Sequence, residues 1–146
     1  MKKLFCLITF LTINIAFSQN KQEVSTLHIS ILEKSNAPLS HQVHSYTYVV
    51  TNNSNKNILY TIKTKSINCK EKSSNMSVKM LNSSFNKVVN INSNDSKSFT
   101  IEMQRNHLTK LDTWSCIQVN AIDNNGIPIS NTITLSQFTP DTRNFK

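Results

Sequence analysis

Apolar and polar residues alternate along most of this chain with a period of two, which is typical of β-strands that bury one face. The alternation predicts strands over residues 24–32, 44–51, 58–65, 98–103, 114–123 and 132–138, and shorter strands over 78–81 and 87–91. Asn- and Ser-rich segments separate these strands, and no βαβ alternation is present. The pattern predicts an all-β fold, an antiparallel β-sandwich of seven or eight strands, and disfavours a parallel α/β enzyme.

The connections are unusual because glycine occurs only once, at Gly126. Asn adopts the left-handed backbone conformation more readily than other non-glycine residues, so the runs at 52–55 and 92–95 predict turns. The first of these turns joins the strands at 44–51 and 58–65, which we expect to form a hairpin. We expect residues 105–113 to form a crossing loop with one helical turn around Leu108 and Leu111.

The first eighteen residues have the organisation of an export signal. Lys2 and Lys3 precede an apolar run over residues 4–17, and small residues near Ser18 suit cleavage there. The run is too short for a membrane span, so we expect periplasmic or extracellular export without one. The expected divisions are a signal peptide (1–18), a flexible mature N-terminus (19–23), one sandwich domain (24–139) and a C-terminal tail (140–146).

The charge of the chain excludes one class of partner. Loss of Lys2 and Lys3 with the signal lowers the formal charge from +8 to +6. An excess of lysine can indicate nucleic-acid binding, but here the lysines are dispersed and Arg105 and Arg143 are the only arginines. We therefore expect no nucleic-acid partner.

Two cysteines remain after cleavage, because Cys6 leaves with the signal. Cys6 lies at the wrong end of the apolar run for lipid attachment. In an oxidising compartment Cys69 and Cys116 predict one intramolecular disulfide, and two unpaired cysteines are the alternative. Cys116 alternates with the apolar residues Ile117 and Val119, so we expect its side chain to point away from the core.

Four stretches of the chain carry a family resemblance, at residues 46–54, 57–64, 96–103 and 117–123. They resemble the strands of bacterial Ig-like accessory domains, such as the C-terminal domain of FixG-type proteins and domains appended to secreted glycosidases. The resemblance covers roughly residues 40–138. It implies an Ig-like or fibronectin-III-like sandwich in an exported bacterial protein.

An Ig-like strand order also places the expected disulfide. In that order the third and sixth strands are antiparallel neighbours, so the end of one meets the start of the other. Their counterparts here are the strand that begins at residue 58 and the last strand but one, at 114–123. We therefore expect Cys69 and Cys116 to bridge two strands near one end of a single sheet, rather than to join the two sheets as in antibody domains.

The residues favour a binding protein over an enzyme. No serine lies in a Gly-rich elbow, the acids form no evident pair, and residues three apart such as His41 and His44 point to opposite faces of a strand. We expect no catalytic site, no metal site and no cofactor. The candidate binding residues are Tyr60 and Trp114, as aromatic anchors, and His107.

The candidate contact surfaces are the strand edges and the loops at 52–57, 105–113 and 124–131. The expected function is that of an exported, non-enzymatic binding or accessory protein. Its partner is predicted to be an envelope or extracellular protein or a carbohydrate, and the oligomeric state is left open. Packing in the core or at its rim is the alternative role of the two aromatic residues.

A copper-handling protein is the alternative function. Met76, Met80, Met103 and His107 carry the soft ligands that suit Cu(I) in an exported protein. Methionines at such spacing also serve as core fillers. Which role applies depends on whether the fold exposes them together.

Overall fold

The computed structural model describes residues 26–69, 76–81 and 85–144. The predicted signal peptide and flexible N-terminus therefore lie outside the described residues, as does the end of the predicted tail. The elements are β1 (Leu27–Glu33), β2 (Val43–Asn52), β3 (Ile58–Ile67), β4 (Ser77–Leu81), β5 (Val88–Ile91), β6 (Ser96–Gln104), β7 (Thr113–Ile122), β8 (Ile133–Thr139) and a 3-10 turn, η1 (Thr142–Asn144).

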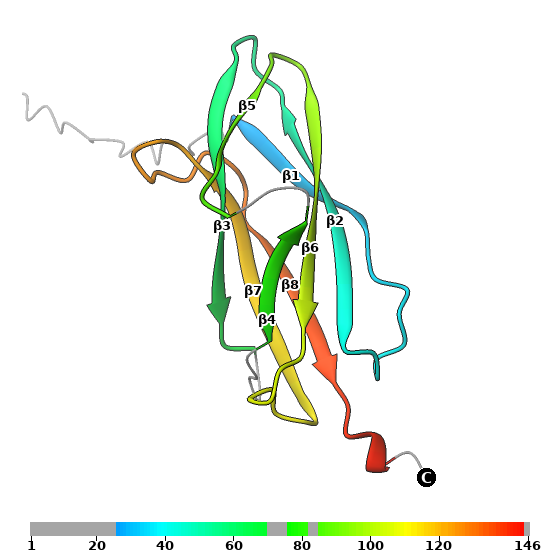
Figure 1. Ribbon diagram of the computed structural model, residues 1–146. Helices are drawn as coiled ribbons and strands as arrows, with labels where there is room; N and C mark the ends of the chain where they lie inside the picture. The colour runs from blue at the N-terminus through cyan, green and yellow to red at the C-terminus, as the bar shows by residue number, and fades with distance from the viewer. Residues whose placement is uncertain (1–25, 70–75, 82–84, 145–146) are drawn as a thin grey trace, which may run out of the picture.

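The strands form two four-stranded antiparallel sheets, in the orders β1-β2-β6-β4 and β5-β3-β7-β8. We call them the first and the second sheet. They make up the two layers of an elongated molecule (Figure 1). The predicted all-β sandwich is confirmed, and eight strands agree with the expected number.

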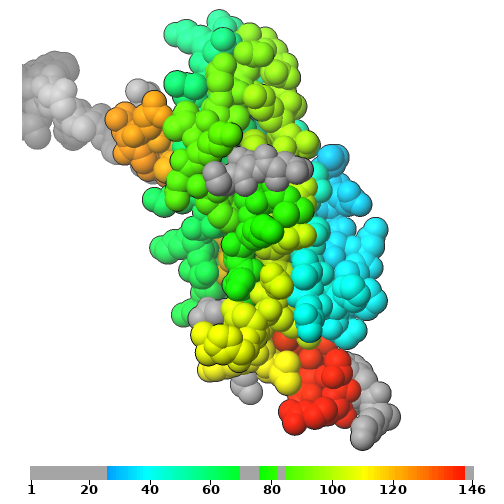
Figure 2. All heavy atoms as spheres, in the orientation of Figure 1, coloured from blue at the N-terminus to red at the C-terminus, as the bar shows by residue number. Residues whose placement is uncertain are grey.

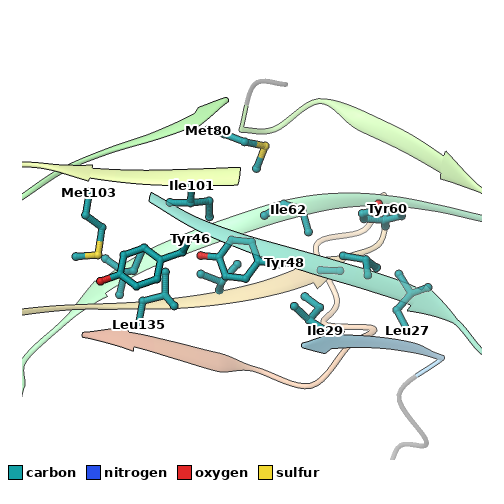
Figure 3. Packing of buried hydrophobic residues seen from close by; sticks show 14 of the residues in the cluster. Leu27, Ile29, Tyr46, Tyr48, Tyr60, Ile62, Met80, Ile101, Met103 and Leu135 are labelled. Atoms are coloured by element: carbon teal, nitrogen blue, oxygen red, sulfur yellow. The ribbon is translucent and has the colours of Figure 1, made fainter. Parts of the chain in front are cut away.

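The core lies between the sheets and follows the predicted alternation. Strand β2 shows this most regularly, because every second residue is buried along its whole length. Figure 3 shows its residues Tyr46 and Tyr48 between the layers, with Ile62 and Leu135 of the second sheet. The buried cluster comprises Leu27, Ile29, Tyr46, Tyr48, Val50, Tyr60, Ile62, Met76, Met80, Ile91, Ile101, Met103, Ile117, Val119, Ala121 and Leu135.

One pairing differs from the prediction, because β2 and β3 do not form a hairpin. Strand β2 pairs with β1 and β6 in the first sheet, whereas β3 pairs with β5 and β7 in the second. Alternation determines which side chains of a strand point inward. The same alternation is found in two strands that pair within one sheet and in two strands that face each other across a core, so it does not identify pairing partners. The expected hairpin is therefore an inter-sheet connection.

The buried side chain of Asn52 holds this connection. Its Nδ2 donates hydrogen bonds to the carbonyl oxygens of Lys56 at 2.7 Å and Asn92 at 2.9 Å, and its Oδ1 accepts from the backbone of Ser54 at 3.0 Å. These bonds tie the β2–β3 turn to the β5–β6 turn at one end of the sandwich (Figure 1). Asn94, in the second turn, has the left-handed conformation expected there, with φ 55°.

The loop between β6 and β7 also differs from the prediction. The helical turn expected around Leu108 and Leu111 does not form; Asn106 instead accepts a hydrogen bond from the backbone of Thr109 in a reverse turn. Both leucines are exposed, so a helix here would have no apolar face to bury. In Figure 2 this loop and η1 lie side by side at one end of the molecule.

Thr61 is buried although it alternates with the core residues Tyr60 and Ile62 and has the same parity as the exposed Lys63. It is the register partner of Val88 on β5 and of Ile122 on β7. Two apolar neighbours in the same cross-strand row cover it on either side. The sequence pattern of β3 alone does not contain this information.

Candidate functional site

The structure places the predicted site residues in different environments, one in the core and two at the surface. Tyr60 is fully buried and packs edge to face against Phe99, with ring centroids 6.1 Å apart. Its assignment as a binding residue is corrected: the side chain fills the core and cannot contact a ligand. His107 is exposed in the β6–β7 loop, and Trp114 is exposed at the start of β7.

The proposed copper ligands do not come together in one accessible site. Met76, Met80 and Met103 lie in the buried core cluster, whereas His107 is exposed. The hydroxyl of Thr139 lies 4.0 Å from the sulfur of Met76 and donates to it. Within residues 26–69, 76–81 and 85–144, no group of three or more His, Cys, Asp and Glu side chains could hold a metal ion. The methionines are used for packing.

Cys69 and Cys116 form a disulfide, with their Cα atoms 5.5 Å apart. Cys116 is the register partner of Ile67, the last residue of β3, and Cys69 follows two residues later. Cys116 alternates with core residues of β7 and is not part of the core cluster. The bridge therefore joins β3 to β7 within the second sheet, on the side turned away from the core.

This side of the second sheet, which we call the outer face, carries an ordered set of side chains. The register places them in rows across β3, β7 and β8. From one end to the other the rows are Lys63 with Asn120, Lys65 with Gln118 and Thr134, Cys116 with Ser136, and Trp114 with Phe138.

A hollow lies at the lysine end of the outer face. Its volume is about 320 Å³. It is lined by Lys63, Thr64, Lys65, Gln118, Asn120, Ile122, Gly126, Pro128 and Thr132. The loop between β7 and β8 forms one wall, because the backbone of Asp123 donates to the carbonyl of Ile127 at 2.9 Å and Gly126 has φ 81°. Part of the predicted contact loop at 124–131 thus borders the hollow.

The charged side chains on the strands that form the outer face are all positive. None of the four strands of the second sheet contains an Asp or a Glu, and Lys63 and Lys65 are their only charged residues. Both lysines are exposed, and no ion pair or side-chain hydrogen bond joins either to another described residue. Two ammonium groups that form no ion pair with a carboxylate of the described residues favour the approach of an anion.

The other end of the outer face is aromatic. The rings of Trp114 and Phe138 are register partners with centroids 5.3 Å apart and planes inclined by 50°. Trp114 is 42% exposed, so much of its surface remains open to a ligand. Four residues along β7 separate Trp114 from Gln118, a distance of about 13 Å in an extended strand.

The core beneath the aromatic end is polar. The hydroxyl of Tyr46 donates to Oε1 of Gln137 at 2.6 Å, and both side chains are buried. By contrast, the buried hydroxyls of Tyr48 and Tyr60 have no hydrogen-bond partner among the described residues. Burial raises the pKa of both phenols. These groups are neutral packing residues, and nothing in their surroundings points to proton transfer.

His44 is buried at the same end of the sandwich as this polar region. Its ring nitrogen Nε2 lies 3.1 Å from the carbonyl oxygen of His41 and donates to it. Burial lowers the pKa of His44 below its ordinary value of 6.5, and the nearby charge of Arg105 acts in the same direction. The imidazole is therefore held neutral inside the fold.

The outer face could have been found in part from the sequence. Lys63, Lys65, Gln118 and Asn120 all have the polar parity of their strands, as Cys116 does. The strand parity and the Ig-like strand order that predict the disulfide also bring these residues together. Phe138 was missed, because its position beside Trp114 depends on the register of β8.

Comparisons with known proteins show the fold alone. No family model and no curated protein matches the chain. A FixG-related protein from Vibrio parahaemolyticus is similar in structure, with TM-score 0.57, 12% identity and coverage of 80% of this chain and 98% of that one. A conjugative transposon lipoprotein from Bacteroides eggerthii has TM-score 0.51, 15% identity and coverage of 77% and 96%.

The first of these structures agrees with the resemblance to FixG-type domains that the sequence carries. Both likenesses cover most of this chain and nearly all of the other protein. Within residues 26–69, 76–81 and 85–144, the structure contains no helix with the length and apolar character needed to cross a membrane.

Proposed function

We propose that this protein is an exported, non-enzymatic accessory protein that binds a carbohydrate chain through the outer face of its second sheet. The observation that carries the proposal is the shared position of Trp114 and Phe138 with two lysines and two amides on one face. A sheet presents these groups on a rigid frame, because strand pairing fixes their backbone: β7 lies between β3 and β8 and pairs with both.

The chemistry of the outer face suits a sugar. A pyranose ring has a face of C–H groups that packs on an aromatic ring, and its hydroxyls require both donors and acceptors. Trp114 and Phe138 supply the aromatic surface. Gln118 and Asn120 are half-buried at the floor of the hollow, and each amide offers donors and an acceptor.

The alternative partner, a folded protein, fits the outer face less well. Cores of protein interfaces are depleted in charged residues and enriched in apolar ones. Here the centre of the outer face is occupied by Lys65, Gln118 and Thr134, with the disulfide beside them. Leu32 and Leu108 are exposed apolar residues on other parts of the molecule, whereas the exposed Leu59 and Val88 lie on β3 and β5, beyond the lysine end of the outer face and away from its centre.

Export is proposed on three grounds: the predicted signal peptide, the disulfide, and the likeness to a structural neighbour that is named a lipoprotein. A disulfide persists where no cytosolic thiol pool reduces it. Edman sequencing of the protein secreted by its native host would show an N-terminus near Gln19 if the signal is cleaved as proposed. An intact Met1 on the exported protein would contradict this part of the proposal.

Affinity electrophoresis tests the binding function. The protein is run through native gels that contain one soluble polysaccharide each, drawn from neutral and acidic plant, algal and bacterial polymers. We expect at least one polymer to retard the wild type and Trp114→Ala to abolish the retardation. Leu32→Ala is the matched control, because Leu32 is also a large exposed apolar residue (67%) but lies on β1. Equal retardation of Trp114→Ala and wild type would refute the proposal.

A further inference from the structure

The charge on the outer face indicates which class of carbohydrate binds there. We infer that the ligand is an acidic polysaccharide, whose carboxylate or sulfate groups are bound by Lys63 and Lys65. This inference rests on the proposed function and names its substrate class. It is carried by three observations: the absence of acids from the second sheet, the two unpaired lysines at the hollow, and the distance between the lysines and the aromatic pair.

The lysines are placed to bind successive anionic groups. They are two residues apart on β3, so their side chains leave the same face about 7 Å apart along the strand. Each has an amide beside it in the register: Asn120 next to Lys63, and Gln118 next to Lys65. Every lysine–amide pair combines a positive charge with a neutral donor and acceptor. A sugar unit that carries both an acid group and hydroxyls requires this combination.

The extent of the face indicates a polymer. From Asn120 to Trp114 is six residues of β7, about 20 Å in an extended strand. A monosaccharide spans a fraction of that distance. An extended chain that lies along β7 can place its acid groups at the lysines and pack another unit on Trp114 at the same time. Several weak contacts then act together within one molecule.

Other polyanions fit these observations less well. Nucleic-acid sites neutralise many phosphates and rely on clustered lysine and arginine. The second sheet has two lysines and no arginine on its strands. A phospholipid surface is flat, whereas the lysines here border a hollow with a wall formed by the β7–β8 loop. The test below includes nucleic acid as a competing ligand.

The test uses the fluorescence of Trp114, which is the only tryptophan of the chain and lies on the proposed surface. Four probes are titrated: polygalacturonate, the same polymer after reduction of its carboxylates to alcohols, heparin, and a single-stranded oligonucleotide. We expect an acidic probe to bind at least tenfold more tightly than the reduced polymer, and its affinity to fall as salt is added. Preference for polygalacturonate assigns carboxylate as the anion, and preference for heparin assigns sulfate.

Two pairs of substitutions locate the charge effect. Lys63→Gln/Lys65→Gln should lose about tenfold or more of the affinity for the acidic probe. Lys79→Gln/Lys97→Gln removes the same charge from exposed positions of the first sheet and should change the affinity less than twofold. Circular dichroism confirms that both variants fold, as expected for substitutions at exposed strand positions.

Three results would overturn the inference. If the reduced polymer binds as tightly as the acidic ones and the lysine variants are unaffected, the acidic ligand is wrong while carbohydrate binding stands. If a single-stranded oligonucleotide binds more tightly than every polysaccharide, the outer face is a nucleic-acid surface. If no probe binds and no gel of the polysaccharide panel retards the protein, the inference and the proposed function both fail.

Discussion

The disulfide offers the most quantitative test of the fold. Cys69 and Cys116 are separated by 47 residues, and the bridge closes this loop in the unfolded chain. The chain-entropy relation gives a stabilisation of about 4 kcal/mol for a loop of this length. Native domains are stable by only about 5–15 kcal/mol in total, so its loss should be large. The double variant Cys69→Ser/Cys116→Ser should melt about 15 °C below the wild type.

The assay is equilibrium unfolding in urea, followed by far-UV circular dichroism and by the fluorescence of Trp114. The oxidised wild type, the wild type in reductant and the double serine variant are compared. We expect the last two to coincide, which attributes the loss to the cross-link rather than to serine. Ser136→Ala, which alters the register partner of Cys116 and leaves the bridge intact, should stay close to the wild type. A difference of less than about 1 kcal/mol between the oxidised wild type and the double variant would refute the reasoning.

Three further predictions concern the core. Tyr46→Phe leaves the buried Oε1 of Gln137 without its donor and should cost about 1–3 kcal/mol of unfolding free energy. Tyr48→Phe removes a hydroxyl that has no partner among the described residues and should be neutral or stabilising in the same urea assay. Met103→Ala should lower the free energy of unfolding by about 2–5 kcal/mol, because Met103 is fully buried. A titration of the wild type with Cu(I) should show no specific binding. Micromolar binding that is lost in Met103→Ala would restore the copper hypothesis. Because burial lowers the pKa of His44 in the folded state, the unfolded chain binds the proton more tightly, so stability should fall as the pH decreases through 6.5. His44→Gln should remove that part of the pH dependence, and an unchanged profile would show that another group is responsible.

The fold was predictable where it depends on one strand at a time. Alternation places Tyr46, Tyr48 and Val50 on one side of their strand, and the structure buries that side, because a half-buried strand repeats every two residues whatever its neighbours are. It does not identify the neighbours. The two strands joined at residues 53–57 belong to different sheets, and the hydrogen bonds of Asn52 to Lys56 and Asn92 help to fix the crossing.

The binding surface was predictable in part for the same reason. The outward parity of Lys65, Gln118 and Cys116 is visible in the sequence, and an Ig-like strand order brings them onto one face. The burial of Tyr60 was predictable in the same way, because its parity with Ile58 and Ile62 places it in the core. The residue type alone suggested an aromatic anchor, and strand parity contradicts that assignment. The hollow depends on how the β7–β8 loop folds back, which needs long-range contacts such as the hydrogen bond from Ile129 to Ala121.

The central claim is that the outer face of the second sheet binds a carbohydrate chain. Backbone amide NMR shifts, recorded during titration with oligosaccharides of the polymer that retards the protein most, test it directly. The account predicts that the largest shifts cluster at Lys63, Lys65, Trp114, Gln118 and Asn120, with the first sheet nearly unchanged. Shifts confined to the first sheet, or to the turns at residues 53–57 and 92–95, would contradict it.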